Sequence, residues 1–280
     1  MEIQTRKGQL VSLLRHGDFF GEGSLMDEHS CRFTSAKAAT PVDLIKIKRE
    51  EFDRYIAAST SAKETLKRKW KARTLTYAKN LIRLQTNVKE RIFHMGDVVY
   101  KEGETGKSMY RVDEREGGEL DVRHGDVVMH KYYQGESFGE SSLLFERPRS
   151  STVVCSSKIC KLHEMLGSDF LAVMESSPET LIALQNMCRK RLFKKAIKMF
   201  SLGKNRGLQN EDIVAAFHEA DKDQTGHLSL DSVRDLMHTL DPTIPESEIL
   251  ALMLFIDVDE DGYCTLGDFK RLFRQFEEDS

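Results

Sequence analysis

The residues from 138 to 153 contain a glycine, a glutamate and an arginine at a spacing suited to binding a phosphorylated sugar. Gly139 and Glu140 open a predicted helical turn, and Arg149 follows nine residues after the glutamate. A helix N-terminus offers unpaired backbone N–H groups to an anion, and a guanidinium adds two parallel hydrogen bonds to phosphate oxygens. Glu140 can accept a hydrogen bond from a ribose hydroxyl, and Gly139 lets the backbone come close to the ligand.

This stretch resembles the phosphate-binding cassette of the cyclic nucleotide-binding domain family. The family's spacing is matched at Phe138, Gly139, Glu140, Leu143, Leu144, Pro148, Arg149 and Thr152. The resemblance implies a small β-barrel flanked by helices, in which Arg149 binds the cyclic phosphate of cAMP or cGMP and Glu140 the ribose 2′-hydroxyl. The implied ligand-binding residues are Phe138, Gly139, Glu140, Ser141, Arg149, Ser150 and Ser151. The alternative interpretation is an ordinary strand–turn–strand with a surface Arg–Glu pair.

Ser150 bears on which base the cassette prefers. In relatives a hydroxyl residue directly after the arginine tends to favour guanine and an alanine adenine, so the resemblance points to cGMP. One hydrogen bond contributes only about 0.5–1.5 kcal/mol net, and the choice between cAMP and cGMP therefore stays open.

The composition is that of a globular protein with room for about two domains. The chain has 280 residues, of which 40% are hydrophobic and 31% charged. No apolar run approaches the roughly 18–20 residues that span a bilayer, and no signal peptide is visible at Met1. The five cysteines are scattered and lack metal-ligand spacing. We therefore expect free thiols and a cytoplasmic location.

The charge is divided unevenly along the chain. Residues 208–280 carry 18 acidic and 5 basic residues, a net charge of −13, whereas the first 207 residues carry 37 basic and 27 acidic ones, a net charge of +10. This division predicts that the two parts attract each other or that the tail binds cations. Nucleic acid is not an expected partner, because the basic residues lie mostly along two helices rather than on a reading element.

The first part of the chain repeats the cassette less faithfully. Phe20-Gly21-Glu22 recurs as Phe138-Gly139-Glu140, 118 residues later. Arg32 lies one residue further from its glutamate than Arg149 does, and such a slip turns a strand side chain to the other face unless the loop absorbs it. Only 19 residues precede Phe20. We therefore expect a truncated copy whose degenerate site (Gly21, Glu22, Arg32) does not bind nucleotide, followed by a strand at Leu44–Ile47.

These observations together predict an α+β architecture. A truncated cyclic nucleotide-binding-like domain (1–60) and a basic connecting helix (61–88) precede a complete jelly-roll-like β-barrel domain (89–206) and an all-α EF-hand pair (208–280). Short β-branched or alternating runs predict the barrel strands, and apolar stripes predict helices over 61–84 and from about Pro178 to Leu202. The resemblance implies that the helix after the cassette moves on nucleotide binding, with Met187, Leu192 and Phe193 as candidates to stack on the base.

Two twelve-residue segments of the acidic tail follow the EF-hand calcium loop. Calcium takes six to eight oxygen ligands from loop positions 1, 3, 5, 7, 9 and 12, with glycine at position 6; Gly226 and Gly262 meet that requirement. Position 12 departs from glutamate in both loops. The second loop is expected to bind Ca²⁺ or the smaller Mg²⁺ through Asp257, Asp259, Asp261, Tyr263 and Asp268. The first is weak or empty, with Asp221, Asp223, Thr225, His227 and Ser232. The alternative is a structural EF-hand pair without regulatory metal.

The sequence therefore predicts a non-catalytic sensor that binds cyclic nucleotide in the second domain and a divalent cation in the tail. No kinase glycine-rich loop, H-R-D or D-F-G motif is present. The basic helix from Pro178 leads into the acidic tail, and Phe193, Ile197 and Phe200 on it suggest a helix held in a groove that couples the two inputs to a protein effector. Two alternatives remain: a fragment or regulatory part of a cyclic-nucleotide-dependent protein kinase, and an EF-hand scaffold with a non-binding cassette.

Overall fold

The computed structural model describes residues 1–5, 8, 10–26, 32, 34–85, 87–175, 178–202, 210–257 and 261–274. The chain forms two compact units, each drawing on two stretches of sequence. One comprises Met1–Asn87 and Ser168–Leu184, and the other Val88–Gly167 and Gln185–Ser280. Each unit has a hydrophobic core of its own. The domain boundaries expected from the sequence remain predictions.

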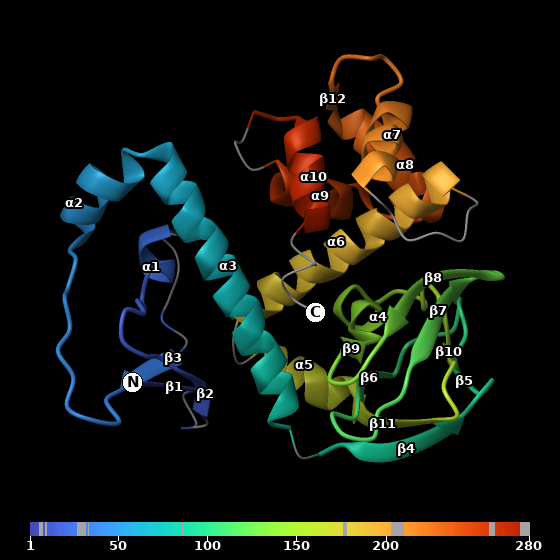
Figure 1. Ribbon diagram of the computed structural model, residues 1–280, viewed down its shortest axis with the longest axis horizontal. Coiled ribbons are helices and arrows are strands. Elements are labelled where there is room, and N and C mark those ends of the chain that lie inside the picture. Colours follow the sequence, from blue (N-terminus) through green and yellow to red (C-terminus); the bar gives the residue numbers. More distant parts are fainter. Residues whose placement is uncertain are drawn as a thin grey trace. The chain divides into compact units, whose positions relative to one another are not determined.

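The larger unit contains a sandwich of two four-stranded sheets (Figure 1). Its strands are β4 (Lys89–His94), β5 (Val98–Tyr100), β6 (Ser108–Val112), β7 (Leu120–His124), β8 (Val127–Tyr132), β9 (Ser137–Phe138), β10 (Thr152–Cys155) and β11 (Ile159–Leu166). One sheet has the order β5-β10-β7-β8 and the other β4-β11-β6-β9. Alternate side chains point inward, as Cys160 and Leu162 of β11 do, and they meet Leu120, Phe138 and Val153 in a buried core.

Helices follow the strands where the alternation of apolar and polar residues ends. The short helix α4 (Glu140–Leu144) interrupts the strands between β9 and β10, and α5 (Gly167–Glu175) follows β11 directly. The long helix α6 (Pro178–Leu202) begins at a proline, a residue that suits the first helical turn because that turn needs no N–H from it. The bounds of α6 agree with the predicted helix.

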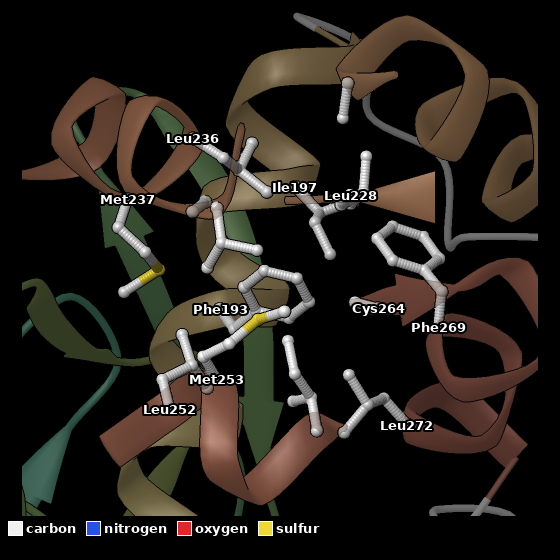
Figure 2. Close-up of a cluster of buried hydrophobic side chains, with 14 of the residues drawn as sticks. Phe193, Ile197, Leu228, Leu236, Met237, Leu252, Met253, Cys264, Phe269 and Leu272 are labelled. Atoms are coloured by element: carbon white, nitrogen blue, oxygen red, sulfur yellow. The ribbon is translucent and has the colours of Figure 1, made fainter. Parts of the chain in front are cut away.

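The acidic end of the chain forms two helix–loop–helix segments, here called the C-terminal helix pair (residues 210–274). It consists of α7 (Asn210–Ala220), β12 (His227–Leu228), α8 (Leu230–Leu240), α9 (Glu246–Ile256), β13 (Cys264–Thr265) and α10 (Leu266–Arg274), and β12 pairs with β13 in antiparallel fashion. Figure 2 shows Phe193 and Ile197 of α6 pointing into the same cluster as Leu236, Leu252 and Phe269. The C-terminal helix pair thus builds its core around one face of α6.

The smaller unit contains the imperfect first copy of the cassette. Its elements are β1 (Glu2–Thr5), β2 (Leu10–Leu13), α1 (Gly23–Met26), β3 (Thr34–Lys37), α2 (Arg49–Phe52), the π-helix η1 (Asp53–Ala57) and α3 (Thr60–Arg83). The sheet order β2-β1-β3 repeats the order β8-β7-β10 of the larger unit, with a shift of about 118 residues in each strand. Ser59 caps α3 by accepting a hydrogen bond from the backbone of Ala62. Ile3, Val11 and Leu81 form the core of this copy.

The structure corrects two expectations. Leu44–Ile47 is not a strand but an extended segment without a strand partner among the described residues, and Ile45 is 96% exposed. Its counterpart β11 pairs with β4 and β6, and no strand among the described residues of the first copy takes the place of those two. Leu192 and Phe193 pack into the core of the C-terminal helix pair, so they are not placed to stack on a base held by the cassette.

In the part of the chain that the structure describes, no helix combines the length and the apolar character needed to cross a membrane.

Candidate functional site

Arg149 lies at the centre of the second cassette and is only 5% exposed. Its guanidinium donates hydrogen bonds to the carbonyl oxygen of Gly139 at 2.6 Å, to Oγ of Ser142 at 2.7 Å and to the carbonyl oxygen of Ser108 at 2.5 Å. It also lies over the ring of Tyr100, 4.2 Å from the centroid. These partners are neutral, so they orient the guanidinium without cancelling its charge. The arrangement is suited to an anionic ligand.

Two glycines make room for this guanidinium. Gly139 has a φ of +83°, a backbone conformation that favours glycine, and a Cβ there would lie 2.7 Å from Nη1 of Arg149. A Cβ on Gly106 would lie 2.0 Å from Oγ of Ser142 and 3.1 Å from Cζ of Arg149. The turn containing Gly103 and Gly106, which superficially resembles a nucleotide-binding P-loop, therefore contributes to the cassette through close backbone packing.

Glu140 opens α4 and is 2% exposed. Its Oε1 accepts a hydrogen bond from Nη1 of Arg191 at 2.6 Å and a weaker one from Sγ of Cys188 at 3.6 Å. Its Oε2 is buried and has no hydrogen-bond partner among the described residues. Burial, together with the nearby Glu140 carboxylate, raises the pKa of the Cys188 thiol well above its usual value, so Cys188 stays protonated and can donate. Glu140 thus keeps one acceptor oxygen unpaired.

The remaining predicted cassette residues occupy different environments. Phe138 is fully buried and stacks on Tyr132, with ring centroids 4.7 Å apart. Ser151 is buried at the start of β10, Ser141 is half-buried in α4, and Ser150 is exposed. The carbonyl oxygen of Ser150 accepts a hydrogen bond from Nζ of Lys195 on α6. The structure therefore brings Gly139, Glu140 and Arg149 together, whereas the three serines range from buried to exposed.

The first copy preserves the same pattern of contacts. Gly21 has a φ of +83°, and a Cβ there would lie 2.6 Å from Nη1 of Arg32. Oγ of Ser24 donates to the carbonyl oxygen of Gly21 at 3.0 Å and accepts from Nη2 of Arg32 at 3.3 Å. Ser142, Gly139 and Arg149 do the same in the second copy. Despite its extra residue of spacing, Arg32 is therefore not turned away from Gly21.

A basic residue from the following helix binds the cassette glutamate in both copies. Arg73 of α3 donates to Oε1 of Glu22, as Arg191 of α6 does to Oε1 of Glu140. The two arginines are 118 residues apart, like the two glycines. Burial raises the pKa of Glu22 above its ordinary value. The first copy differs from the second in that Arg32 is exposed, whereas Arg149 is buried.

The loops of the C-terminal helix pair carry two buried aspartates at equivalent positions. Oδ2 of Asp221 accepts the backbone N–H of Gly226 at 2.9 Å, and Oδ2 of Asp257 accepts that of Gly262 at 2.8 Å. Asp221 is 3% exposed and Asp257 7% exposed. In the described residues, no three His, Cys, Asp or Glu side chains converge as a metal-binding group. Asp259, one of the predicted ligands, lies outside the described residues.

The residues predicted at the last position of each loop form hydrogen bonds or close contacts within the chain. Asp268 is 2% exposed and accepts hydrogen bonds from Oγ1 of Thr265 at 2.5 Å and from Nη1 of Arg271 at 3.3 Å. Oγ of Ser232 lies 3.2 Å from Oγ of Ser229, the residue that caps α8. The other predicted ligands sit around the paired strands. Oγ1 of Thr225 lies within hydrogen-bond distance of Oδ1 of Asp223, at 3.2 Å, and of the carbonyl oxygen of His227, at 3.0 Å. The backbone N–H of Tyr263 donates to Asp261, and the rings of His227 and Tyr263 lie edge to face.

Four residues of the site were missed from the sequence: Tyr100, Gly106, Ser142 and Arg191. Arg191 is one of several cations on α6, and its sequence neighbours do not distinguish it. The repeat offers the one signal that could have found it, because Arg73 and Arg191 share the offset of 118 residues that relates the two cassettes. The same offset relates Ser24 to Ser142.

The comparison with known families agrees with this geometry. The model of the cyclic nucleotide-binding domain matches residues 1–59 and 90–177. The match covers more than half of the chain, in two segments that correspond to the two copies. The chain belongs to the cyclic nucleotide-binding domain family.

Curated relatives share parts of this sequence. The chain is 31% identical over 153 residues to a cAMP-dependent protein kinase regulatory subunit of Debaryomyces hansenii, covering 52% of this chain and 33% of that protein. It is 28% identical over 149 residues to a cGMP-dependent protein kinase of Plasmodium berghei, covering 53% of this chain and 15% of that protein. It is 37% identical over 67 residues to calcium-dependent protein kinase 21 of Oryza sativa subsp. japonica, covering 23% of this chain and 12% of that protein. The chain thus spans a third or less of each of these relatives.

Proposed function

We propose that this chain is a non-catalytic, cytoplasmic regulatory protein that binds one cyclic nucleotide, cAMP or cGMP, in the cassette around Arg149. Two features of the cassette carry the proposal. The buried guanidinium of Arg149 is held by neutral oxygens, and the buried Glu140 has an Oε2 without a hydrogen-bond partner among the described residues. Buried polar groups in folded proteins are nearly always hydrogen-bonded. A ligand with both an anion and a hydroxyl group would satisfy the two residues together.

A cyclic nucleotide has these two groups in the required order. Its 2′-hydroxyl lies next to the 3′ oxygen that carries the cyclic phosphate, so one ribose can present both to neighbouring residues. The phosphate would pair with Arg149, and the hydroxyl would donate to Oε2 of Glu140. Hydrogen bonds to charged groups contribute about 1.5–3 kcal/mol each, so loss of either residue should be measurable in binding.

Calorimetric titration with cAMP and with cGMP tests this proposal. The wild-type chain is expected to bind at one site, Arg149→Ala to lose binding, and Arg149→Lys to bind more weakly because a lysine cannot form the bidentate contact. Arg32→Ala is the matched control, since it removes the equivalent arginine of the first copy. Nucleotide binding that survives Arg149→Ala would contradict the proposal. Two sites, one removed by each alanine variant, would assign a nucleotide to the first copy as well.

We also propose that the C-terminal helix pair is an EF-hand pair that holds a divalent cation. Buried carboxylates need compensation for the cost of losing water, and Asp221 and Asp257 supply hard oxygens of the kind that Ca²⁺ and Mg²⁺ prefer. Asp257, Asp259, Asp261, Tyr263 and Asp268 would hold the ion in the second loop, with Asp221, Asp223, Thr225, His227 and Ser232 as the weaker set. The similarity to a calcium-dependent protein kinase supports this assignment. A bound cation would neutralise the loop carboxylates.

The hydrogen bonds that Asp268 already forms in the second loop compete with a bound cation and so lower the expected cation affinity. Asp268 bonds to Thr265 and Arg271, and a cation that used its carboxylate would have to displace these partners. Aspartate is also one methylene shorter than the glutamate usual at this position. We therefore expect Ca²⁺ binding weaker than in loops with glutamate, and an appreciable affinity for Mg²⁺. Titration with each ion after chelation tests this, and absence of binding by both ions would leave the pair a structural element.

Helix α6 is the element that could couple the two ligands. One of its faces bears Arg191, which binds Glu140 of the cassette. Another bears Phe193 and Ile197, which lie in the core of the C-terminal helix pair. Arg189 of the same helix forms a two-pronged ion pair with Glu248 of α9, at 2.8 and 3.2 Å. A movement of α6 that accompanies nucleotide binding would therefore act on the C-terminal helix pair.

A second contact between the cassette and the C-terminal helix pair does not involve α6. Arg147, two residues before Arg149, donates to the carbonyl oxygen of Thr243 at 2.9 Å and lies 3.9 Å from Oδ2 of Asp241. Thr243 and Asp241 belong to the connection between α8 and α9. The chain thus has two routes by which a change in the cassette could reach the helices that flank the metal loops.

Nucleotide affinity measured with chelator and with saturating Ca²⁺ tests the coupling. A coupled protein shows different affinities, and Glu248→Gln reduces the difference because it breaks the ion pair with Arg189. Lys161→Ala is a suitable control, since Lys161 lies on β11, away from both loops, and pairs at 3.2 Å with the exposed Glu90. Equal affinities with and without Ca²⁺ would show that the two sites are independent.

The effector is best sought among protein kinases. A kinase regulatory subunit and a cyclic-nucleotide-dependent kinase are among the relatives, although the chain covers at most 33% of either. We propose that the chain controls a kinase, on the same polypeptide or another. Purification from its source with a nucleotide-dependent kinase activity would support this. A chain that binds no nucleotide but retains protein partners would instead be a scaffold.

A further inference from the structure

The first copy contains a cavity of about 390 Å³ that shares no lining residue with its cassette site. Phe19, Ile56, Ala62 and Leu66 form the apolar part of its wall, and Lys69 is the charged residue that lines it. Ligand-binding pockets in proteins commonly measure about 300–1,000 Å³ and combine an apolar lining with a few polar groups. The cavity therefore has the size and the lining of a site for a small amphipathic molecule.

Two neighbouring elements of the first copy form this cavity. Ser61, Thr65 and Lys69 follow one another at steps of four residues along α3, so their side chains share one face of the helix. Ile56 belongs to the π-helix η1, which precedes α3, and π-helices are rare but frequently found at functional sites. Eight residues of helix rise about 12 Å. The cavity therefore follows α3 for about two turns, from its first residues to Lys69.

The repeat shows that the wall of this cavity is more positive than the matching surface of the second copy. At the offset of 118 residues, Ser61 corresponds to Glu179 and Lys69 to Met187. The first difference removes a negative charge and the second adds a positive one. The other lining positions are neutral in both copies. The difference in charge at the cavity is therefore confined to this face of α3 and favours an anion.

The apolar part of the wall also differs between the two copies in its exposure. Met174 and Leu184, the counterparts of Ile56 and Leu66, are almost completely buried, whereas Ile56 and Leu66 are half-buried. Removal of apolar surface from water is favourable. At these positions the first copy therefore keeps a surface that the apolar part of a ligand can cover.

Lys69 supplies an unneutralised charge at one end of the cavity. Its Nζ lies 5.9 Å from the centroid of the Phe19 ring, and no carboxylate among the described residues forms an ion pair with it. Arg73 lies over the same ring at 4.7 Å, but its charge is paired with Glu22. An ammonium group offers three hydrogen-bond donors and no acceptor. An anionic group is therefore the ligand chemistry that suits this end of the cavity.

We propose that this cavity binds an amphipathic anion such as a medium-chain carboxylate, with the carboxylate at Lys69 and the apolar chain against Ile56 and Leu66. Burial of the chain supplies affinity, and the contact between ammonium and carboxylate selects a negatively charged ligand. The site is separate from the cassette around Arg149, so the inference does not depend on nucleotide binding there.

Calorimetric titration of the full chain with decanoate and with decylammonium, each below the concentration at which it forms micelles, tests the inference. The two probes have the same chain and opposite charges. We expect decanoate to bind at one site at least about tenfold more tightly than decylammonium, since a hydrogen bond to a charged group is worth about this factor or more. Lys69→Met, which introduces the residue found in the second copy, should weaken decanoate binding at least about tenfold.

Two further variants locate the bound probe. Lys63→Met removes an exposed cation of α3 that does not line the cavity, and it should change decanoate affinity about twofold or less. Ala62→Leu extends a side chain into the cavity and should weaken the binding of both probes. Thermal unfolding of each variant establishes that a lost affinity does not reflect a lost fold.

Three outcomes would overturn the inference. Equal affinities for the two probes, or equal losses of decanoate affinity in Lys69→Met and Lys63→Met, would show that Lys69 does not select the charge of the ligand. Decanoate that binds to Ala62→Leu as tightly as to the wild type would occupy a different part of the chain. Absence of decanoate binding would show that the cavity does not hold an amphipathic carboxylate.

Discussion

Replacement of Phe193 by alanine should release the C-terminal helix pair from α6. The side chain of Phe193 is fully buried, and its ring meets that of Phe269 edge to face with centroids 5.9 Å apart. Truncation of a buried phenylalanine to alanine costs about 3–5 kcal/mol, because the lost burial is followed by a cavity that the surroundings fill only in part. That cost is a large share of the roughly 5–15 kcal/mol that holds a domain together.

Native-state hydrogen exchange followed by mass spectrometry measures the effect where it is expected. A loss of 3–5 kcal/mol lowers the protection of amides in α7–α10 by about two to three and a half powers of ten. Amides of the sandwich core should change much less, since that core is a separate cluster. Phe193→Leu keeps most of the buried volume and should give a smaller effect.

Ile182→Ala is the matched control, because Ile182 lies on the same helix but is 55% exposed. An exposed substitution of this kind changes stability by about 0.5 kcal/mol or less. If Phe193→Ala leaves the protection of α7–α10 within tenfold of the wild type, Phe193 does not anchor the C-terminal helix pair, and the coupling through α6 loses its structural basis.

Three further predictions concern single residues. Gly106→Ala should lower cyclic nucleotide affinity at least about tenfold. The added Cβ would lie 2.0 Å from Oγ of Ser142 and would displace this side chain, which holds Arg149. Calorimetry measures the affinity, and an unchanged value would contradict the close packing. Asp113→Asn should cost about 1–3 kcal/mol at neutral pH. The backbone N–H groups of residues 116 and 115 and the His163 ring hold the pKa of Asp113 well below its usual value. The contribution of the Asp113 carboxylate to the free energy of unfolding is therefore fully present above pH ~4 and is lost as the pH falls through the folded-state pKa. Denaturant unfolding of the wild type and of Asp113→Asn at pH 7 and at pH 2 measures this contribution. If the difference in the free energy of unfolding is the same at both pH values, the prediction is wrong. Asp257→Asn should abolish or strongly weaken Ca²⁺ binding to the second loop, and an unaltered Ca²⁺ titration would exclude Asp257 as a ligand.

The sequence predicted the second copy well because its signals are local. The β-branched runs, the turn at Gly139 and the long helix from Pro178 each depend on residues close together in the chain. The structure has strands and a turn there, and the bounds of the helix agree with the prediction. The placement of Arg149 beside Gly139 followed from the family resemblance. The contacts of Gly106 and Tyr100 with Arg149 could not be predicted in this way, because they join residues more than forty positions apart.

The first copy and α6 show why other predictions failed. Leu44–Ile47 has the composition of a strand, but a strand needs neighbouring strands to pair with, and none of the described residues pairs with this segment. Phe193 lies on an apolar stripe, and a stripe alone does not tell which of two neighbouring cores it enters. The charge division predicted that the basic part of the chain and the acidic tail attract each other or that the tail binds cations, and Arg189–Glu248 is one ion pair between the two parts. The identity of the paired residues depends on the fold.

The matching arginines of the two copies define what was duplicated in this chain. Arg73 and Arg191 each lie on the long helix that follows their cassette, and each binds the glutamate of its own cassette. The repeating module is therefore the cassette together with the next helix, and the glutamate–arginine pair joins its two parts. Such a module can be moved as a whole. A chimera that joins the first cassette to the helix of the second should preserve the pair, whereas a junction cut immediately after the sandwich would separate each glutamate from its arginine.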